Sequence, residues 1–264
     1  MHPLSLAPAT VGELGPVDVV ECAAAAGFAS TGVRPPDPAR DAPATAAALR
    51  RTGVALLDLE YVRIAPGPLT DGQLATADAA AELGARFLLV VSDDPDPGAT
   101  AAALAALRDR LAGSPTAVAL EFMAFTAVRR LADAVDLARR VPGVRVLLDP
   151  LHLARGGDAA DAPADVDPSL LGYGQLCDAG PPPTGADRTA ALAQEARHDR
   201  LPPGHGELPL AAFLGSLPPD LPLSVEVHSD RLRAQLDPVA RARLVHDAAR
   251  TLLDTTLLDP TPEV

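Results

Sequence analysis

Polar side chains that can bind a metal or move a proton follow several hydrophobic runs in the second half of the sequence. Short apolar runs are closed by Glu121, Asp149, Gln175 and Glu226, and His152 follows Asp149 by three positions. If the runs are neighbouring parallel strands, their carboxyl ends meet at one mouth and these side chains converge. Carboxylates buried together are costly unless a cation neutralises them. An all-oxygen ligand set favours Mn²⁺ or Mg²⁺ over a metal that prefers thiolates.

Each of these residues also has a purely structural explanation. A single Glu or Asp at a strand end commonly caps a helix or forms a loop salt bridge. Asp149 precedes Pro150, which is typical of a turn, and His152 could be a buried core histidine. The metal site is favoured because the polar side chains end four consecutive predicted strands.

The elements that must position these residues alternate along the chain. Short apolar, often β-branched runs alternate with longer stretches of Ala, Leu and Arg, which indicates βα units around a parallel sheet. The predicted strands are Leu4–Ala7, Ser30–Val33, Ala55–Leu59, Phe87–Val91, Ala117–Glu121, Arg145–Asp149, Tyr173–Leu176 and Leu223–Val227. The predicted helices are Val17–Ala26, Ala44–Arg51, Asp71–Leu83, Thr100–Leu111, Thr126–Arg140, Leu208–Leu214 and Pro238–Leu253.

Eight strands over 264 residues predict a (β/α)₈ TIM barrel that forms a single domain over residues 1–264. Two stretches rich in Gly, Asp and Pro interrupt the alternation, Gly156–Pro168 and Asp178–Gly206. Since both come after a predicted strand, we expect both at the carboxyl-terminal mouth of the barrel. Connections of this length are usually functional lids or disordered segments.

Composition excludes several classes of function. All 22 cationic Lys or Arg residues are arginines, so Schiff-base, pyridoxal-phosphate and Walker-type chemistries, which need a lysine amine, are excluded. A net charge of −13 argues against a nucleic-acid partner.

The apolar runs are too short for a membrane span and no signal peptide is evident, so we expect a cytoplasmic protein. The two cysteines are too few for a disulfide framework or a zinc-thiolate cluster, and assembly into a homo-oligomer stays open.

Five motifs occur in an order that resembles a known family. They are Leu120-Glu121-Phe122, Leu147-Leu148-Asp149-Pro150-Leu151-His152, Gln175-Leu176-Cys177-Asp178-Ala179, Pro203-Gly204-His205-Gly206-Glu207-Leu208 and Ser224-Val225-Glu226-Val227. Together they resemble the xylose-isomerase-like TIM barrel superfamily, the group of sugar phosphate isomerases and epimerases that also includes dehydratases and apurinic endonucleases. The resemblance covers nearly the whole chain, because Gly53–Pro66 and Glu82–Asp94 resemble the third and fourth strand regions of the family.

The resemblance implies roles for individual residues. In isomerase and epimerase members one divalent metal is bound by residues that match Glu121, Asp149, Gln175 and Glu226, and the two Glu ligands also serve as acid and base. The matching substrate-binding residues are His152, three positions after Asp149, and Arg200, the arginine nearest to the Pro-Gly-x-Gly turn, with Arg197 as an alternative. We add His198 and Glu60 as candidate substrate-binding residues because both lie near the predicted mouth.

The sequence departs from the family pattern at two positions. Gln175 replaces the His of many epimerases and is familiar in dehydratase-like members, and His205 stands where an acidic residue is common. Asp178 either orients Gln175 or forms a turn, and Cys177 is predicted to be a buried packing residue rather than a nucleophile. Glu60 and Arg63 either reach substrate or form a salt bridge between strands. Phe122, Met123 and Phe125 are expected to fill the core or to form a wall of the pocket.

Three functions are compatible with these residues. The first is a divalent-metal isomerase or epimerase of a sugar or cyclitol, in which proton transfer beside a carbonyl group passes through an enediolate; His152 joins Glu121 and Glu226 as a catalytic candidate. The metal would be Mn²⁺, with Mg²⁺, Co²⁺ or Zn²⁺ as alternatives. The second is a lyase on the same scaffold, either a 3-dehydroshikimate- or inosose-type dehydratase or a β-eliminating deglycosylase. The third is a non-catalytic binding subunit.

Overall fold

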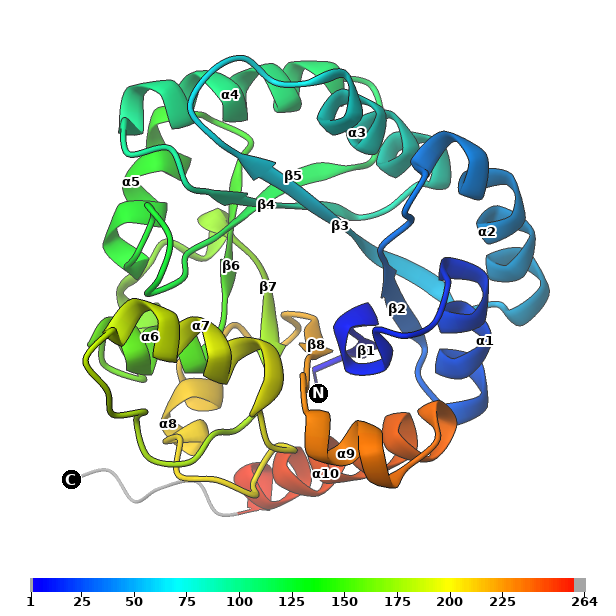
Figure 1. The fold of residues 1–264 in the computed structure, drawn as a ribbon, viewed down its shortest axis with the longest axis vertical. Coiled ribbons are helices and arrows are strands. Elements are labelled where there is room, and N and C mark those ends of the chain that lie inside the picture. The colour runs from blue at the N-terminus through cyan, green and yellow to red at the C-terminus, as the bar shows by residue number, and fades with distance from the viewer. Residues whose placement is uncertain (1, 259–264) are drawn as a thin grey trace.

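Eight parallel strands form a closed barrel in the computed structural model, which describes residues 2–258 (Figure 1). Each strand pairs with its neighbours in chain order, and β1 closes the barrel by pairing with β8. The strands are β1 (Leu4–Leu6), β2 (Ser30–Val33), β3 (Ala55–Ile64), β4 (Phe87–Ser92), β5 (Ala117–Glu121), β6 (Arg145–Leu148), β7 (Leu171–Leu176) and β8 (Leu223–Val225).

Helices surround the barrel as an outer ring (Figure 1). They are α1 (Pro16–Ala26), α2 (Pro38–Thr52), α3 (Asp71–Leu83), α4 (Pro97–Arg110), α5 (Leu131–Arg140), α6 (Pro150–Gly156), α7 (Arg188–His198), α8 (Leu210–Gly215), α9 (Asp230–Gln235) and α10 (Pro238–Leu258). This arrangement confirms the predicted (β/α)₈ TIM barrel. Within the part of the chain that the structure describes, no helix combines the length and hydropathy that a membrane crossing requires.

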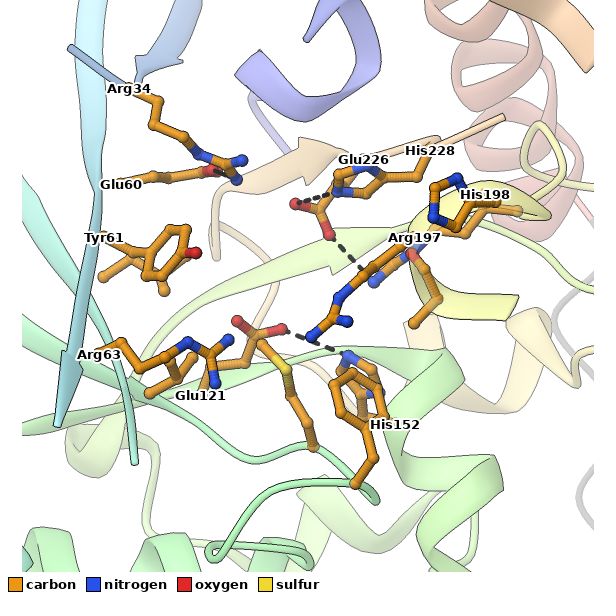
Figure 2. Close-up of a pocket in the computed structure, with 16 residues that line it drawn as sticks. Arg34, Glu60, Tyr61, Arg63, Glu121, His152, Arg197, His198, Glu226 and His228 are labelled. Atoms are coloured by element: carbon orange, nitrogen blue, oxygen red, sulfur yellow. Dashed lines mark hydrogen bonds and ion pairs between the residues drawn. The ribbon is translucent and has the colours of Figure 1, made fainter. Parts of the chain in front are cut away.

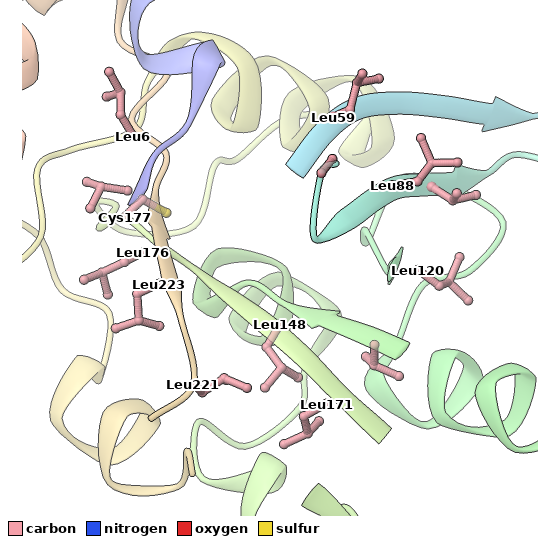
Figure 3. Packing of buried hydrophobic residues seen from close by; sticks show 14 of the residues in the cluster. Leu6, Leu59, Leu88, Leu120, Leu148, Leu171, Leu176, Cys177, Leu221 and Leu223 are labelled. Atoms are coloured by element: carbon pink, nitrogen blue, oxygen red, sulfur yellow. The ribbon is translucent and has the colours of Figure 1, made fainter. Parts of the chain in front are cut away.

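The strands are apolar because both of their faces are buried. All six residues of β4 are buried, and they alternate between two packing environments. Leu88 and Val90 belong to the outer core between strands and helices, whereas Phe87, Leu89 and Val91 pack inside the barrel. Figure 3 shows the outer core, where Leu88, Leu120 and Leu148 pack with leucines of other strands. The period of two residues therefore fixes which side chains enter the barrel.

This alternation carries the candidate site residues into the barrel mouth. The inner cluster contains Ala119, Leu147 and Tyr173. Two positions further along β5, β6 and β7, the side chains of Glu121, Asp149 and Gln175 face the same side. All three are at most 2% exposed. Burial of polar groups at this edge is thus a direct result of strand geometry.

Some predicted helix boundaries were wrong. The helix predicted over Thr126–Arg140 begins only at Leu131. Val128 has the helical spacing that motivated the earlier start, but it is buried in the preceding loop, where the backbone oxygen of Val128 accepts a hydrogen bond from the hydroxyl of Thr126. The side chain of Asp133 accepts a hydrogen bond from the backbone amide of Arg130 and fixes the helix start there.

The two irregular stretches also differ from expectation. Helix α6 follows β6 directly, so Gly156–Pro168 leads from a helix to β7, not from a strand into the mouth. The stretch Asp178–Gly206 contains helix α7 and is tied down by a bridge between Asp178 and Leu201. This second stretch therefore forms an ordered cover beside the mouth.

Candidate active site

A pocket of about 300 Å³ opens at the carboxyl-terminal mouth of the barrel (Figure 2). Its lining includes Glu60, Glu121, His152, Arg200 and Glu226, all of which the sequence singled out. Asp149 and Gln175 are buried at the strand ends below them. The structure therefore brings together residues that lie up to 166 positions apart in the sequence.

Three candidate ligand atoms lie close together on the floor of the pocket. Side-chain atoms of Glu121, Asp149 and His152 that could bind a metal are all within 4.8 Å of one another. Nε2 of His152 lies 3.6 Å from Oε1 of Glu121 and 3.7 Å from Oδ2 of Asp149. His152, predicted to bind substrate, thus lies beside the predicted metal ligands Glu121 and Asp149.

Asp149 holds its position through the start of α6. The residue caps the helix, and its Oδ1 accepts a hydrogen bond of 2.7 Å from the backbone amide of Leu151. Pro150 occupies the first helical position, where its missing amide hydrogen costs nothing. The helix then turns His152 back toward Glu121. The capping role and the predicted ligand role of Asp149 are compatible, because Oδ2 is not used by the cap.

Arg200 links two of the predicted ligands. Its Nη1 donates to Oδ2 of Asp149 at 2.8 Å, and its Nη2 lies 3.1 Å from Oε2 of Glu226. Its Nε donates to the backbone oxygen of Ala196 at 2.8 Å. The arginine is 2% exposed, so its charge is held almost entirely by these carboxylates. Arg200 therefore organises the floor of the pocket, and its contact with substrate stays a prediction.

Several buried polar atoms on the floor lack a partner. Oε1 of Gln175, Oε1 of Glu60 and Nε2 of His152 make no hydrogen bond within the described residues. A buried acceptor without a donor is costly, whereas a cation bound beside these acceptors would satisfy them. The donors are carboxylate, amide and imidazole groups, which suit a divalent metal such as Mn²⁺ or Zn²⁺. The residues present thus fit one divalent metal ion.

Burial and mutual repulsion raise the pKa of the two glutamates. The pKa of Glu121 is raised well above its ordinary value by burial, then by the charges of Glu226 and Asp149. Burial raises the pKa of Glu226 to about 7, although Arg200 opposes the shift. A carboxylic acid whose pKa lies near neutrality, as that of Glu226 does, can both accept and return a proton.

The pKa values of Asp149 and His152, which lie beside the glutamates, are lowered instead. Burial alone would raise the pKa of Asp149, but the charges of Arg200 and His152 and the hydrogen bonds to the carboxylate lower it. The pKa of His152 is lowered to about 4, chiefly by burial, with a further contribution from Arg200. At neutral pH, Asp149 is therefore an anion and His152 a neutral imidazole.

Of the remaining predicted substrate-binding residues, Glu60 is buried with 3% exposure, whereas His198 lies nearer the rim. Glu60 lies in β3 and is paired with Arg34, whereas Nδ1 of His198 lies 3.1 Å from Oδ2 of Asp230. Both Glu60 and His198 line the pocket. Arg63 lines it too and forms a salt bridge of 2.7 Å with Asp93, which confirms the salt-bridge alternative.

Asp178 and Cys177 both have structural roles beside the site. Asp178 forms turns, because its oxygens accept from the backbone amides of Ala179, Gly206 and Leu208 at 2.8, 2.8 and 3.0 Å. Gly206 leaves the room for this contact, since a Cβ there would lie 2.3 Å from the oxygen of Ala179. Cys177 is buried, as predicted, and its Sγ contacts Arg200 at 3.2 Å.

The aromatic residues near the mouth divide between core and pocket, and two further histidines lie in nearby loops. Phe122 is a core residue, whereas Met123 and Phe125 form one wall of the pocket. His205 is exposed in its loop. His228 lines the pocket, and its Nε2 lies 3.7 Å from Oε1 of Glu226.

Sequence reasoning missed three features of the site. Arg34 directly follows β2, a position that could have marked it as a mouth residue, and Tyr61 lies between the guanidinium groups of Arg34 and Arg63 at 5.0 and 5.5 Å. The hydroxyl of Tyr173 donates to Oδ2 of the buried Asp58 at 3.0 Å inside the barrel. No sequence signal connects these last two, which are 115 positions apart.

Comparison with known proteins decides the family. A sequence model described as "Xylose isomerase-like TIM barrel" matches residues 20–253. The chain belongs to the xylose isomerase-like TIM barrel family. The match confirms the resemblance inferred from the strand-end motifs. No curated protein sequence matches the chain.

Several solved structures share this family fold. One, a xylose isomerase-like TIM barrel/4-hydroxyphenylpyruvate dioxygenase fusion protein, has a TM-score of 0.77 and 22% identity over 97% of this chain, which spans 43% of that protein. The IOLI protein, solved with a bound zinc atom, has a TM-score of 0.77 and 16% identity, covering 99% of this chain and 100% of its own.

Two further structures have names that describe different reactions. D-allulose 3-epimerase from Methylomonas sp. has a TM-score of 0.71 and 16% identity, covering 95% of this chain and 96% of its own. The probable 3-DHS dehydratase AsbF from Bacillus anthracis has a TM-score of 0.72 and 14% identity, covering 93% of this chain and 99% of its own. At these identities the likeness shows the fold alone.

Proposed function

We propose that this protein is a divalent-metal-dependent isomerase or epimerase that acts on a small polyhydroxylated keto compound, a sugar or a cyclitol. The observation that carries the proposal is the convergence of Glu121, Asp149 and Glu226 around His152 and Arg200 on the floor of one pocket. Buried acids of raised pKa at such a position suit proton transfer at carbon.

The metal would be held by Glu121, Asp149, Gln175 and Glu226, with His152 as an alternative ligand close by. The proposal is supported by the unpartnered Oε1 of Gln175 and by the repulsion that raises the pKa of Glu121. A divalent ion bound there supplies Lewis-acid polarisation of a carbonyl group. Mn²⁺ suits the oxygen-rich ligand set, and Mg²⁺, Co²⁺ or Zn²⁺ are alternatives.

The two glutamates are suited to act from opposite sides of the substrate. In Figure 2, Glu121, the last residue of β5, and Glu226, which directly follows β8, lie across the pocket from one another. One carboxylate takes the proton from the carbon beside the carbonyl group, which leaves an enediolate. The other returns a proton, to the same carbon for epimerisation or to its neighbour for isomerisation.

His152 and Arg200 complete the site. Neutral His152, with a pKa of about 4, can donate one hydrogen bond to a hydroxyl or a developing oxyanion without giving up a full charge. Arg200 holds Asp149 and Glu226 in place and keeps Asp149 ionised. The small volume of the pocket, about 300 Å³, suits a compound of sugar size.

Hydrogen exchange at carbon tests the proposal. Mn²⁺-loaded protein incubated with ketoses in D₂O should incorporate carbon-bound deuterium, detected by mass spectrometry. Glu226→Gln should slow the exchange about 10²- to 10⁴-fold, the usual contribution of a positioned acid or base. Glu82→Gln, at an exposed position in α3, is the matched control and should leave the rate unchanged. An unchanged rate in Glu226→Gln would sink the assigned role.

A lyase on the same scaffold is the second candidate. Dehydration begins with the same proton abstraction, after which water is lost from the neighbouring carbon. The buried Gln175, which stands where many epimerases have His, favours this alternative, and the carboxylate that takes the proton from carbon can return it to the departing hydroxyl group as water is lost. A product that absorbs as a conjugated enone or an aromatic acid would distinguish elimination from isomerisation.

A further inference from the structure

The arginines of the pocket differ in how their charges are compensated. Arg34 pairs with Glu60, Arg63 pairs with Asp93 at 2.7 Å, and Arg200 pairs with two carboxylates on the floor. Arg197 also lines the pocket. Among residues 2–258, it makes no ion pair or hydrogen bond, and its one described contact is with the ring of Phe125, 5.5 Å from the guanidinium carbon. Its charge is therefore available to a ligand.

The backbone that carries Arg197 is held firmly. Arg197 lies in the last turn of α7, and Figure 2 shows its side chain extending from that helix into the pocket. Two positions earlier, Glu195 is buried and makes a bidentate ion pair with Arg155 of α6 at 2.6 and 2.8 Å. The same helix supplies the backbone oxygen of Ala196 to Arg200. The unpaired guanidinium is thus presented on a fixed support beside the floor.

The other charges around the pocket are compensated by one another or by a bound divalent ion. Four buried carboxylates, those of Glu60, Glu121, Asp149 and Glu226, face the charges of Arg200 on the floor and of Arg34, which pairs with Glu60 and is 43% exposed. A divalent ion, bound to ionised carboxylates as the proposed function requires, brings the sum of these charges to zero. Because Arg63 pairs with Asp93, Arg197 is the arginine of the pocket whose charge has no partner among the described residues.

We propose that the substrate of this pocket carries a carboxylate group and that Arg197 binds it at the rim. The proposal rests on the proposed function, since the metal site below Arg197 would hold the carbonyl and hydroxyl end of the same molecule. A guanidinium fork matches a planar carboxylate through two parallel hydrogen bonds. The ring of Phe125 fixes one face of the fork and leaves its edge open to the ligand.

A carboxylate fits this rim better than a phosphate. One uncompensated positive charge matches a monoanion, whereas a phosphate monoester carries close to two negative charges at neutral pH. Arg197 and His198 lie at the carboxyl end of α7, where the helix dipole is negative. This helix end disfavours any anion, and a dianionic phosphate more than a monoanionic carboxylate. The rim therefore selects a polyhydroxylated keto acid over a neutral sugar and over a sugar phosphate.

Three six-carbon ketones serve as probes: 5-keto-D-gluconate carries a carboxylate, D-fructose has no charge, and D-fructose 6-phosphate carries a phosphate. Their dissociation constants are measured by calorimetry on Mn²⁺-loaded protein. Wild-type protein should bind 5-keto-D-gluconate at least about tenfold more tightly than the other two. Arg197→Gln should abolish this preference, weakening the binding of 5-keto-D-gluconate at least about tenfold and that of D-fructose less. Arg50→Gln, exposed near the end of α2, is the matched control and should keep it.

Equal binding of D-fructose and 5-keto-D-gluconate, or a carboxylate preference that survives in Arg197→Gln, would overturn the inference. Failure of 5-keto-D-gluconate to bind at millimolar concentration would do the same. A preference for the phosphate that depends on Arg197 would replace the carboxylate with a phosphate. Mn²⁺ binding and deuterium exchange, measured on the same samples, report on the proposed function separately. A carboxylate preference without metal binding would support Arg197 and contradict the metal site.

Discussion

The floor and the rim of the pocket use the same residue types in opposite ways. On the floor, Asp149 and Arg200 are almost fully buried and their pair is reinforced by Glu226. On the rim, Arg63 and Asp93 also form an ion pair, but their side chains are 32% and 41% exposed. Water screens the rim pair, whereas the floor pair exchanges hydration for protein contacts. Burial therefore decides which charges are structural and which are available to a ligand.

This difference predicts a large stability effect at the floor. Asp149→Ala removes the partner of a buried arginine and the cap of α6, so the free energy of unfolding should fall by about 3–5 kcal/mol. Urea denaturation of the metal-free protein measures the change. Asp149→Asn keeps the cap acceptor and should recover part of the loss; a loss below about 1 kcal/mol in Asp149→Ala would mean that the floor is as well screened as the rim.

Gln175 tests whether the floor binds metal. Oε1 of Gln175 is buried and has no donor within the described residues, so the amide contributes little to the fold but can serve a cation. Gln175→Leu should weaken Mn²⁺ binding by at least about tenfold, the effect usual for losing even an outer-sphere partner. Manganese titration followed by electron paramagnetic resonance gives the affinity, and a urea curve checks that the fold is retained. Unchanged affinity would remove Gln175 from the ligand set.

The floor should also release protons when it binds metal. Because burial raises the pKa of Glu226 to about 7, the metal-free protein holds a proton there below that pH, whereas a metal ligand must be ionised. Mn²⁺ affinity should therefore rise by about tenfold per pH unit for each proton released, up to about pH 7. Calorimetry in buffers of different ionisation enthalpy counts the protons.

The pH dependence of the stability of the metal-free protein independently tests whether the pKa of Glu226 is raised. A raised carboxyl pKa means that the folded state binds the extra proton between about pH 4.5 and 7, so this contribution to stability is lost as the pH rises through 7. Glu226→Gln should remove that part of the pH dependence. A metal affinity that does not vary with pH would contradict the assignment of Glu226 as a ligand.

The rim should give the smallest effect. Asp93→Ala breaks a screened pair, so the free energy of unfolding should change by less than about 1 kcal/mol. The substitution also frees the charge of Arg63 in the pocket that Arg197 lines, which should strengthen the binding of 5-keto-D-gluconate slightly at low ionic strength. A loss of stability comparable with that of Asp149→Ala would erase the contrast between the two regions.

The fold could be predicted from the sequence because strand burial leaves a local pattern. Fully apolar runs such as Phe87–Val91 indicate strands covered on both faces, and their regular spacing indicates a closed βα barrel. Helix starts were less predictable. Residues such as Val128 have helical spacing but are buried by tertiary contacts, and the backbone amide of Arg130 is bonded to Asp133 in the helix that begins after it.

The candidate ligands could be found in the same way, since each closes a strand and all strands of a barrel end at one mouth. The side-chain pairs that form around these residues could not be predicted. Arg34 meets Glu60, and Tyr173 meets Asp58, through contacts across different strands of the barrel. Only the closed barrel brings such residues within hydrogen-bonding distance, and no local spacing encodes which pairs will form.

By itself, the sequence determined the barrel and the chemical types at its mouth, because a repeating pattern of two residues along each strand fixes what faces inward. Only the tertiary structure decided what each charge does there. Arg197 and Arg200 are three positions apart, and the sequence offered both as substrate-binding candidates. Helix α7 ends at His198, so the chain turns Arg200 down to the buried carboxylates while Arg197 stays at the rim without a partner. Burial and the end of one helix separate their roles.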